Sequence, residues 1–167
     1  MKVLILSDVH GQIETLQTIL ERHHDVDACL SAGDQELPQS WLDKHSIQAV
    51  YGNAFQDSGE AMIQTVFEAW RVVMVHGHRH HVHRGDHGLV QLMAQTQADI
   101  IVHGHTHVLR LTQTGKGYLL NPGAVSHSRS SFPSSYVMID FVKEAATVSF
   151  YEARTGSLLF EPRMLRK

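Results

Sequence analysis

The segment Asp99-Ile-Ile-Val-His-Gly-His-Thr-His107 joins a short apolar run directly to three histidines. The run from Ile100 to Val102 is typical of a buried strand, and Gly104 leaves the backbone free to turn where the strand ends. Three imidazoles at one strand end suggest a metal site. A polar turn that is rich in histidine explains the same residues equally well in isolation, so the choice depends on partners elsewhere in the chain.

The same arrangement, an apolar run followed by metal-capable side chains, recurs along the chain. Lys2 to Ser7 is a continuous apolar run, as expected for a strand buried on both faces. The carboxyl ends of parallel strands meet at one edge of an α/β sheet, so loops that follow such runs are expected to converge. The runs at 2–7, 27–32, 47–51 and 71–75 are followed by Asp8 and His10, by Asp34, by Asn53 and by His76.

Helical periodicity separates several of these runs. Apolar residues recur at helical spacing in 11–24, near 38–42 and in 89–97. The segment 79–88 is expected to be a polar loop. We expect one α/β domain over residues 1–167, with two packed sheets and helices outside them. Beyond residue 107 only strands are expected, at 108–113, 118–120, 136–142, 147–152 and 158–160.

The composition excludes several classes of protein. With 167 residues, 43% hydrophobic and 19% charged, the chain is long enough to bury one sizeable core. The formal net charge of -3 offers no basic surface for long nucleic acid. Cys29 is the single cysteine, so no internal disulfide forms, and no apolar run reaches membrane-spanning length. We therefore expect a cytoplasmic protein with no membrane partner.

The metal-capable residues at the strand ends are too many for one four-coordinate site. Two metals that share a carboxylate would use them all, and Asp34 is the natural bridge. Oxygen and imidazole donors without thiolate suit manganese first, with iron, zinc or nickel as alternatives. Two such ions about 3.5–4 Å apart can clamp a phosphoryl group, which indicates phosphoester hydrolysis. The seven candidate ligands are Asp8, His10, Asp34, Asn53, His76, His105 and His107.

The ordered motifs resemble those of the calcineurin-like metallophosphoesterases, and the compact length resembles the small bacterial YfcE-type phosphodiesterase branch. The resemblance extends from Met1 to about Tyr136. It implies a four-layer αββα sandwich with two mixed sheets flanked by helices, and phosphodiesterase activity on a small phosphoester. The motifs are Asp8-Val-His10, Gly33-Asp34, Gly52-Asn53, His76-Gly-His78, Gly104-His-Thr-His107 and Asn121-Pro-Gly-Ala124.

The resemblance also implies a division of the ligands. Asp34 would bridge two metal ions, and a hydroxide between the ions would attack phosphorus directly. His103 matches no ligand position and is expected to be a strand-end or hydrogen-bonding residue. One ion would be held by Asp8, His10 and His107, and the other by Asn53, His76 and His105.

The chain departs from the family pattern after Asn53. Many relatives continue with a histidine or cysteine and then an acid, whereas this chain has Ala54 and Phe55. A missing proton donor costs roughly 100- to 10,000-fold in rate for poor leaving groups. We therefore expect a preference for activated or diester-type substrates, unless His78 substitutes. His78 either faces the phosphate as a catalytic group or only supports a ligand.

The remaining candidates concern the substrate. Asn53 and His78 are expected to contact it, and Arg129 either donates two hydrogen bonds to a phosphate or is a plain surface residue. Histidine is unusually abundant, with 14 residues, six of them between His76 and His87. His80, His81, His83 and His87 form a solvated rim, a substrate-contact surface or an extra metal site.

Two rival functions stay open. A non-catalytic Vps29-like scaffold has the same fold with altered ligand positions, and the Ala54-Phe55 change favours it, whereas the intact ligand set does not. A nuclease of the superfamily is disfavoured, because such relatives generally carry capping domains and basic surface. A β-rich carboxyl half leaves edge strands that a second copy could cover, so a homo-oligomer is a further expectation.

Overall fold

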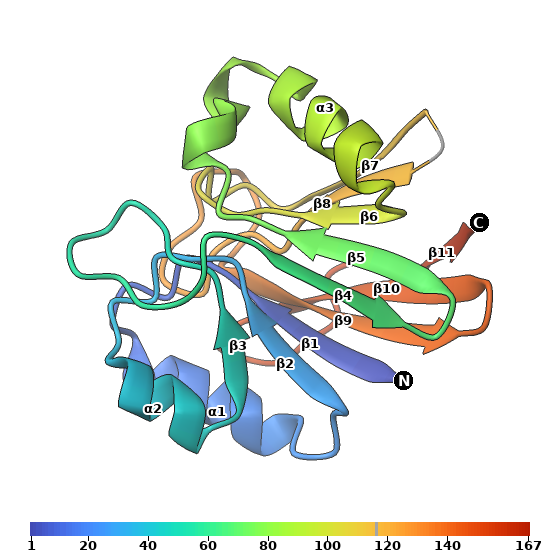
Figure 1. Ribbon diagram of the computed structural model, residues 1–167. Coiled ribbons are helices and arrows are strands. Elements are labelled where there is room, and N and C mark those ends of the chain that lie inside the picture. The colour runs from blue at the N-terminus through green and yellow to red at the C-terminus, as the bar shows by residue number, and fades with distance from the viewer. Residues whose placement is uncertain (116) are drawn as a thin grey trace.

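The computed structural model describes residues 1–115 and 117–167, and its centre consists of two sheets packed face to face (Figure 1). The six-stranded sheet has the order β11-β10-β9-β1-β2-β3, and the five-stranded sheet has the order β4-β5-β6-β8-β7. The strands of the first sheet are β1 (Lys2–Leu6), β2 (Ala28–Ser31), β3 (Ile47–Ala49), β9 (Ser135–Val142), β10 (Ala145–Glu152) and β11 (Arg163–Arg166). Those of the second are β4 (Ile63–Phe67), β5 (Trp70–Met74), β6 (Ile100–Val102), β7 (Arg110–Thr114) and β8 (Gly117–Asn121).

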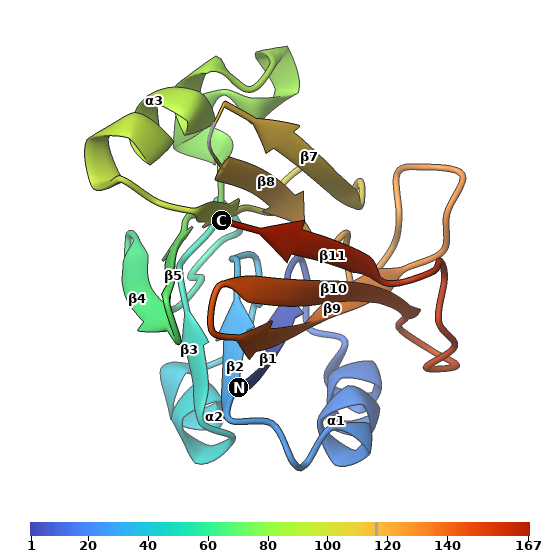
Figure 2. The ribbon, with the colours of Figure 1, turned by 90° about the vertical axis from the view of Figure 1, so that its right-hand side faces the viewer.

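The six-stranded sheet is parallel at its β3 end and antiparallel at its β11 end, whereas the five-stranded sheet has a parallel centre and antiparallel edges. β1, β2 and β3 are parallel, as are β5, β6 and β8, whereas β9, β10, β11, β4 and β7 pair antiparallel. Helices α1 (Ile13–Arg22) and α2 (Gln39–Lys44) connect the first parallel strands, and α3 (His87–Thr96) connects β5 to β6. Figure 2 shows α3 on one side of the two sheets and α1 and α2 on the other. Both sheets are therefore mixed and flanked by helices, as predicted.

The continuous apolar run of β1 is buried on both of its faces. Val3 and Ile5 pack between the two sheets, and Leu4 and Leu6 pack in the cluster that includes α1 and α2. Alternate residues of a strand point to opposite faces, so a strand between two apolar layers must be apolar throughout. Sheet on sheet with a helical layer outside each is the four-layer αββα sandwich that the sequence predicts.

The prediction for 158–160 was wrong. Leu158 makes only an isolated bridge with Tyr151, and the last strand is β11. Pro162, which has no N–H to donate to a ladder, separates the two segments. Only Leu165 of β11 is buried, so this strand lacks the apolar pattern by which the others are recognised.

The segment expected to be a polar loop contains two short 3-10 helices, η1 (His78–His80) and η2 (Val82–Arg84). They lie between β5 and α3, at the carboxyl edge of the second sheet. In the part of the chain that the structure describes, no helix is long and apolar enough to cross a membrane.

Candidate metal centre

Six metal-capable side chains form two groups where the carboxyl ends of the two sheets meet. Within each group one ligand atom per residue lies within 4.8 Å of the others. The loops after β1 and β2 are joined by backbone hydrogen bonds from Asp8 N to Gly33 O at 2.9 Å and from His10 N to Asp34 O at 2.9 Å. The groups are Asp8, His10 and His107, which we call the first triad, and Asp34, His76 and His105, the second triad.

Asp34 lies between the two triads. Its Oδ2 is 3.3 Å from Nε2 of His76 in the second triad and 3.8 Å from Nε2 of His10 in the first. Its Oδ1 accepts hydrogen bonds from the backbone N–H groups of Asn53 at 2.7 Å and Ala54 at 2.8 Å. One oxygen is thus held by the protein while the other faces both triads, which is the position that a bridging carboxylate requires.

Two buried ligand atoms are unsatisfied within the described structure. Asp8 Oδ2 accepts from Ser7 Oγ at 2.6 Å and from His105 N at 3.1 Å, while Asp8 Oδ1 has no hydrogen-bond partner among the described residues. The same holds for His76 Nε2. An unpaired buried carboxylate oxygen is costly unless a cation or donor completes it. These two atoms therefore fit a divalent cation.

The ring orientations of three histidines agree with metal ligation. Nδ1 of His76 donates to the Ala32 carbonyl at 2.7 Å, Nδ1 of His107 donates to the His127 carbonyl at 2.9 Å, and Nδ1 of His10 lies 3.0 Å from Glu36 Oε1. A proton fixed on Nδ1 leaves Nε2 as a lone-pair donor that faces the centre. The imidazoles are therefore prepared as ligands by hydrogen bonds outside the centre.

The backbone of the ligand loops is strained. A positive φ is uncommon outside glycine and costs of order 1–3 kcal/mol where the surroundings enforce it. Such strain persists at sites where function requires a particular side-chain direction. Five of the six triad residues have a positive φ, namely Asp8 (φ 51°), His10 (46°), Asp34 (54°), His105 (69°) and His107 (57°).

The motif glycines allow close approach to the ligands. A Cβ on Gly52 would overlap Oδ1 of Asp34, and a Cβ on Gly104 would overlap Oγ of Ser7 and lie 2.7 Å from Asp8 Oδ2. Neither glycine has a positive φ in the structure, so the requirement is space and not backbone conformation. This gives a physical reason for a glycine before Asn53 and before His105.

Asp57 braces the two loops that carry Asp34 and Asn53, and sequence reasoning missed it. Its Oδ2 accepts from the backbone N–H groups of Asp34 at 2.7 Å and Gly52 at 2.7 Å. Its Oδ1 accepts from those of residues 35 at 2.9 Å and 36 at 3.0 Å. One half-buried carboxylate thus joins four N–H groups from two loops. It follows Asn53 by four residues, which is later than the acid expected from the family pattern.

The electrostatics of the second triad favour an ionised carboxylate. Burial alone would raise the pKa of Asp34, but the adjacent His76 and the N–H groups of residues 53 and 54 hold that pKa well below its usual range. Burial lowers the pKa of His76, but the facing carboxylate of Asp34 and the charge of Asp8 outweigh burial and raise it. Burial and the neighbouring His76 and His83 lower the pKa of His105 to about 4, so its imidazole is neutral, as ligation requires.

The structure places the remaining predicted residues around the centre. The backbone of Asn53 contacts Asp34 and its side chain is exposed. The His78 ring lies 5.3 Å from that of His76, centroid to centroid. Arg129 is exposed, and its backbone N–H donates to the His107 carbonyl at 3.0 Å. His103 belongs to neither triad of the described residues. It is buried, and its Nδ1 donates to the Gly104 carbonyl at 3.1 Å.

The histidine tract divides in the structure. The ring of His83 lies 4.5 Å from that of His105, at the rim of the second triad. His80, His81 and His87 instead line a separate hollow against α3.

His127 is a second residue that sequence reasoning missed. Its ring lies 4.6 Å from that of His107 and 6.2 Å from that of His10, and its side chain is exposed. The preceding Ser126 donates from Oγ to the Asp8 carbonyl at 2.7 Å. Their position just beyond the Asn121-Pro-Gly-Ala124 motif was the one available signal.

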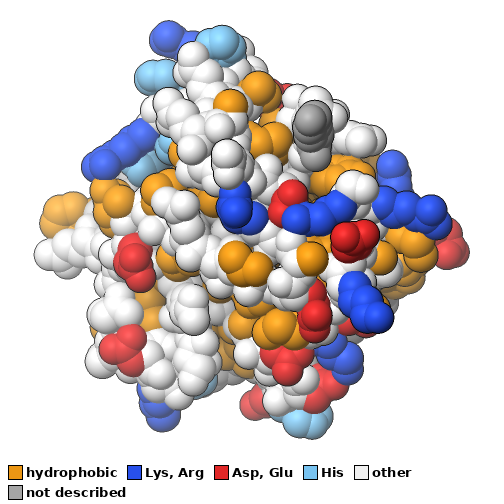
Figure 3. Space-filling view, turned by 45° about the vertical axis from the view of Figure 1, so that its right-hand side comes forward, with side chains coloured by type: hydrophobic (Ala, Val, Ile, Leu, Met, Phe, Trp, Pro, Cys, Tyr) orange, Lys and Arg blue, Asp and Glu red, His pale blue; other side chains and the backbone are white. Residues whose placement is uncertain are grey.

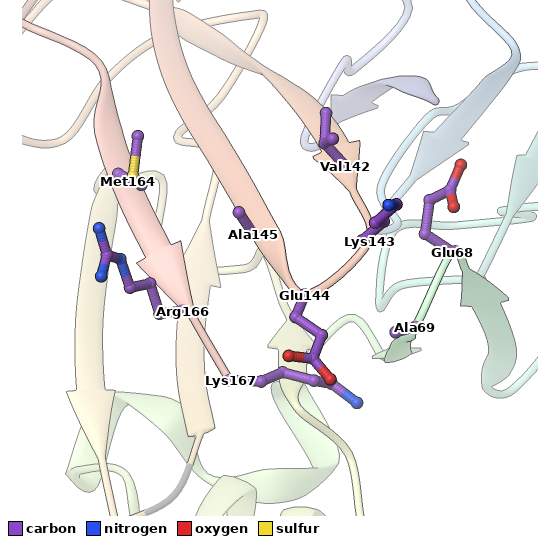
Figure 4. Close-up of a pocket in the computed structure, with 9 residues that line it drawn as sticks. All are labelled: Glu68, Ala69, Val142, Lys143, Glu144, Ala145, Met164, Arg166 and Lys167. Carbon is purple, nitrogen blue, oxygen red and sulfur yellow. The ribbon is translucent and has the colours of Figure 1, made fainter.

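A hollow of about 810 Å³ lies at the opposite edge of the molecule, beside the β4–β5 and β9–β10 turns and the end of β11 (Figure 4). Its lining mixes the acidic Glu68 and Glu144 with the basic Lys143, Arg166 and Lys167. Figure 3 shows acidic, basic and hydrophobic side chains mixed over this face. None of the predicted site residues lines this hollow, so it is not the candidate site.

Comparisons with known proteins agree with this geometry. The family model of the calcineurin-like phosphoesterase superfamily domain matches residues 1–144. The probable metallophosphoesterase YsnB of Bacillus subtilis is 30% identical over 154 residues, covering 91% of each chain. The phosphodiesterase YfcE of Escherichia coli is 27% identical over 168 residues, covering 84% of this chain and 88% of the relative.

Solved structures show the same fold. A predicted phosphoesterase from Streptococcus pneumoniae superimposes with a TM-score of 0.88 at 22% identity, covering 99% of this chain and 97% of that one. Vacuolar protein sorting 29 from Cryptosporidium parvum superimposes with a TM-score of 0.80 at 18% identity, covering 99% and 98%.

Proposed function

Because the chain belongs to the calcineurin-like phosphoesterase superfamily, we propose that it is a phosphodiesterase whose two triads each hold one divalent ion. The single observation that carries the proposal is the position of Asp34 Oδ2, within 3.3 Å of His76 Nε2 and 3.8 Å of His10 Nε2. Manganese is the first candidate metal, because the donors are carboxylate and imidazole without thiolate. Bound ions would supply positive charge to a phosphoryl group and acidify water.

The protein's own groups prepare this centre for a small phosphoester. His10 and His105 are partly exposed, so a phosphate can reach the centre from solvent. The exposed side chains of Asn53 and Arg129 lie on loops bonded to Asp34 and His107, and we propose that they orient the phosphate. His78, beside the second triad, is proposed to contact the same group.

The leaving group receives no proton from residue 54, because alanine stands there. The enzyme should therefore act best on esters whose leaving group departs as a stable anion. The expected substrates are activated or diester-type. We place turnover in the cytoplasm, because the single, buried Cys29 forms no disulfide and needs no oxidising compartment. The sheets end on strands β3, β11, β4 and β7, so a second copy could cover an edge.

The test is turnover of bis(p-nitrophenyl) phosphate by the purified protein with added manganese. We expect hydrolysis faster than that of p-nitrophenyl phosphate, and metal content that falls together with turnover in Asp34→Asn. The matched control is Asp43→Asn, which changes an exposed carboxylate on α2. Retained turnover and metal content in Asp34→Asn would show that the bridge is wrongly placed.

The alternative is a non-catalytic scaffold of the Vps29 type, which the Ala54-Phe55 change favours. The same assay separates the two functions, because a scaffold gives no rate above buffer at any metal concentration. Cleavage of duplex DNA faster than of small diesters would instead favour a nuclease.

A further inference from the structure

A hollow of about 320 Å³ lies between the two 3-10 helices and α3, on the outer side of the second sheet. Its lining includes two arginines, Arg79 and Arg84, and three histidines, His80, His81 and His87. Two glutamines of α3 complete its polar wall, and none of the described residues that line it is acidic. The upper end of Figure 3, around this segment, shows basic and histidine side chains together.

The positive charge of the hollow is not neutralised by a neighbouring carboxylate. Asp86, next to this segment in sequence, is turned to Arg110, which donates to both of its oxygens at 2.7 and 2.6 Å. Neither Arg79 nor Arg84 forms an ion pair with a carboxylate among the described residues. A chain with a formal net charge of -3 thus presents an uncompensated basic hollow.

Side-chain contacts connect the hollow to the metal centre. The guanidinium carbon of Arg79 lies 5.1 Å from the centroid of the Tyr51 ring, and that ring lies 6.5 Å from the ring of His78. Arg84 follows His83, whose ring contacts that of His105. These contacts mark the route by which a small molecule with one phosphorus at the centre would extend toward the two arginines.

We propose that this hollow binds a second phosphate group of the substrate, so that the preferred substrates are small phosphodiesters that carry an additional phosphate monoester. Guanidinium groups match phosphate oxygens in a two-pronged geometry, and the histidine N–H groups add donors. Binding a non-reacting part of the substrate assists reaction at the other end, which suits a site without a proton donor at Ala54. The inference rests on the proposed phosphodiesterase function.

The experiment compares two chromogenic diesters with the same leaving group, thymidine 5′-(p-nitrophenyl phosphate) with and without a 3′-phosphate. We expect kcat/KM to be about tenfold higher for the 3′-phosphorylated ester, as for hydrogen bonds to a charged group. The double variant Arg79→Gln/Arg84→Gln should bring this ratio to about one. The matched control, Arg163→Gln on β11, should keep it. A wild-type ratio of one, or a ratio that survives in the double variant, overturns the proposal.

Calorimetry with thymidine 3′,5′-bisphosphate and EDTA gives a readout that needs no turnover. We expect binding by the wild type and by Arg163→Gln, and a loss of affinity of about tenfold in the double variant. Absence of binding, or equal binding by all three proteins, also overturns the proposal. Turnover of the unphosphorylated ester tests the proposed function separately, so the two failures are distinguishable.

Discussion

Replacing Asp57 by Asn should loosen the metal-binding loops without removing a ligand. The carboxylate accepts four backbone N–H groups, two at each oxygen, from the loops that carry Asp34 and Gly52. The amide keeps one acceptor oxygen, so two N–H groups lose their partner and face an NH2 group. A hydrogen bond to a charged group contributes about 1.5–3 kcal/mol, and the lower value suits a half-exposed site. We therefore expect the free energy of unfolding to fall by about 3 kcal/mol.

The assay is urea unfolding of the metal-free protein, followed by manganese titration of the folded variant. Metal affinity should fall as well, because the Asp34 backbone loses one of its anchors. The matched control is Asp43→Asn, since that exposed carboxylate accepts from Gln39 Nε2 at 2.8 Å within one helix. If Asp57→Asn unfolds at the same urea concentration as the wild type and binds manganese equally well, the brace does not hold these loops.

Three further changes test other parts of the centre. Gly104→Ala should lower both stability, by about 2 kcal/mol, and manganese affinity, because its Cβ would stand 2.7 Å from Asp8 Oδ2. Gly115→Ala has open space but a φ of +54°, so it should cost about 1–2 kcal/mol in urea unfolding and leave manganese affinity unchanged. Burial lowers the pKa of His103 to about 4 from 6.5, so its contribution to stability is present above pH 6.5 and is lost as the pH falls toward 4. Between pH 7 and 4 the free energy of unfolding of His103→Gln should therefore fall by about 3 kcal/mol less than that of the wild type. Parallel curves of unfolding free energy against pH for the two proteins would contradict this. Ala54→His should raise the rate on alkyl phosphodiesters by about 100-fold with little gain on nitrophenyl esters, and an equal gain on both would contradict a missing proton donor.

The fold was predictable where burial determines the residue type along a whole strand. Val3 to Leu6 must be apolar on both faces, and such runs are recognisable without knowledge of their partners. The edge strand β11 buries only Leu165, so an edge position leaves almost no pattern. The apolar pair Leu158 and Leu159 instead gave a false strand, although Leu158 is exposed and Leu159 is only partly buried.

The candidate site was predictable to the extent that ligands follow strands directly. Asp57 and Ser126 act on backbone N–H and carbonyl groups, whose positions depend on how two loops meet. The spacing of residues along the sequence does not indicate which loops lie side by side. His127 contacts His107 across a gap of twenty positions, and only the loop after β8 brings them together.

The three histidines after β6 lie in three different environments. His103 still hydrogen-bonds to the β8 end through its backbone N–H, which donates to Leu120 O at 2.9 Å, so its ring remains buried. His105 and His107 both adopt a positive φ, and each turn directs the next imidazole to a different triad. Glycine would relieve that strain but could not supply a ligand, so strained histidines at these positions are difficult to explain by stability. Binding of cations by both triads would provide the compensation, which argues for a metal centre over a polar turn.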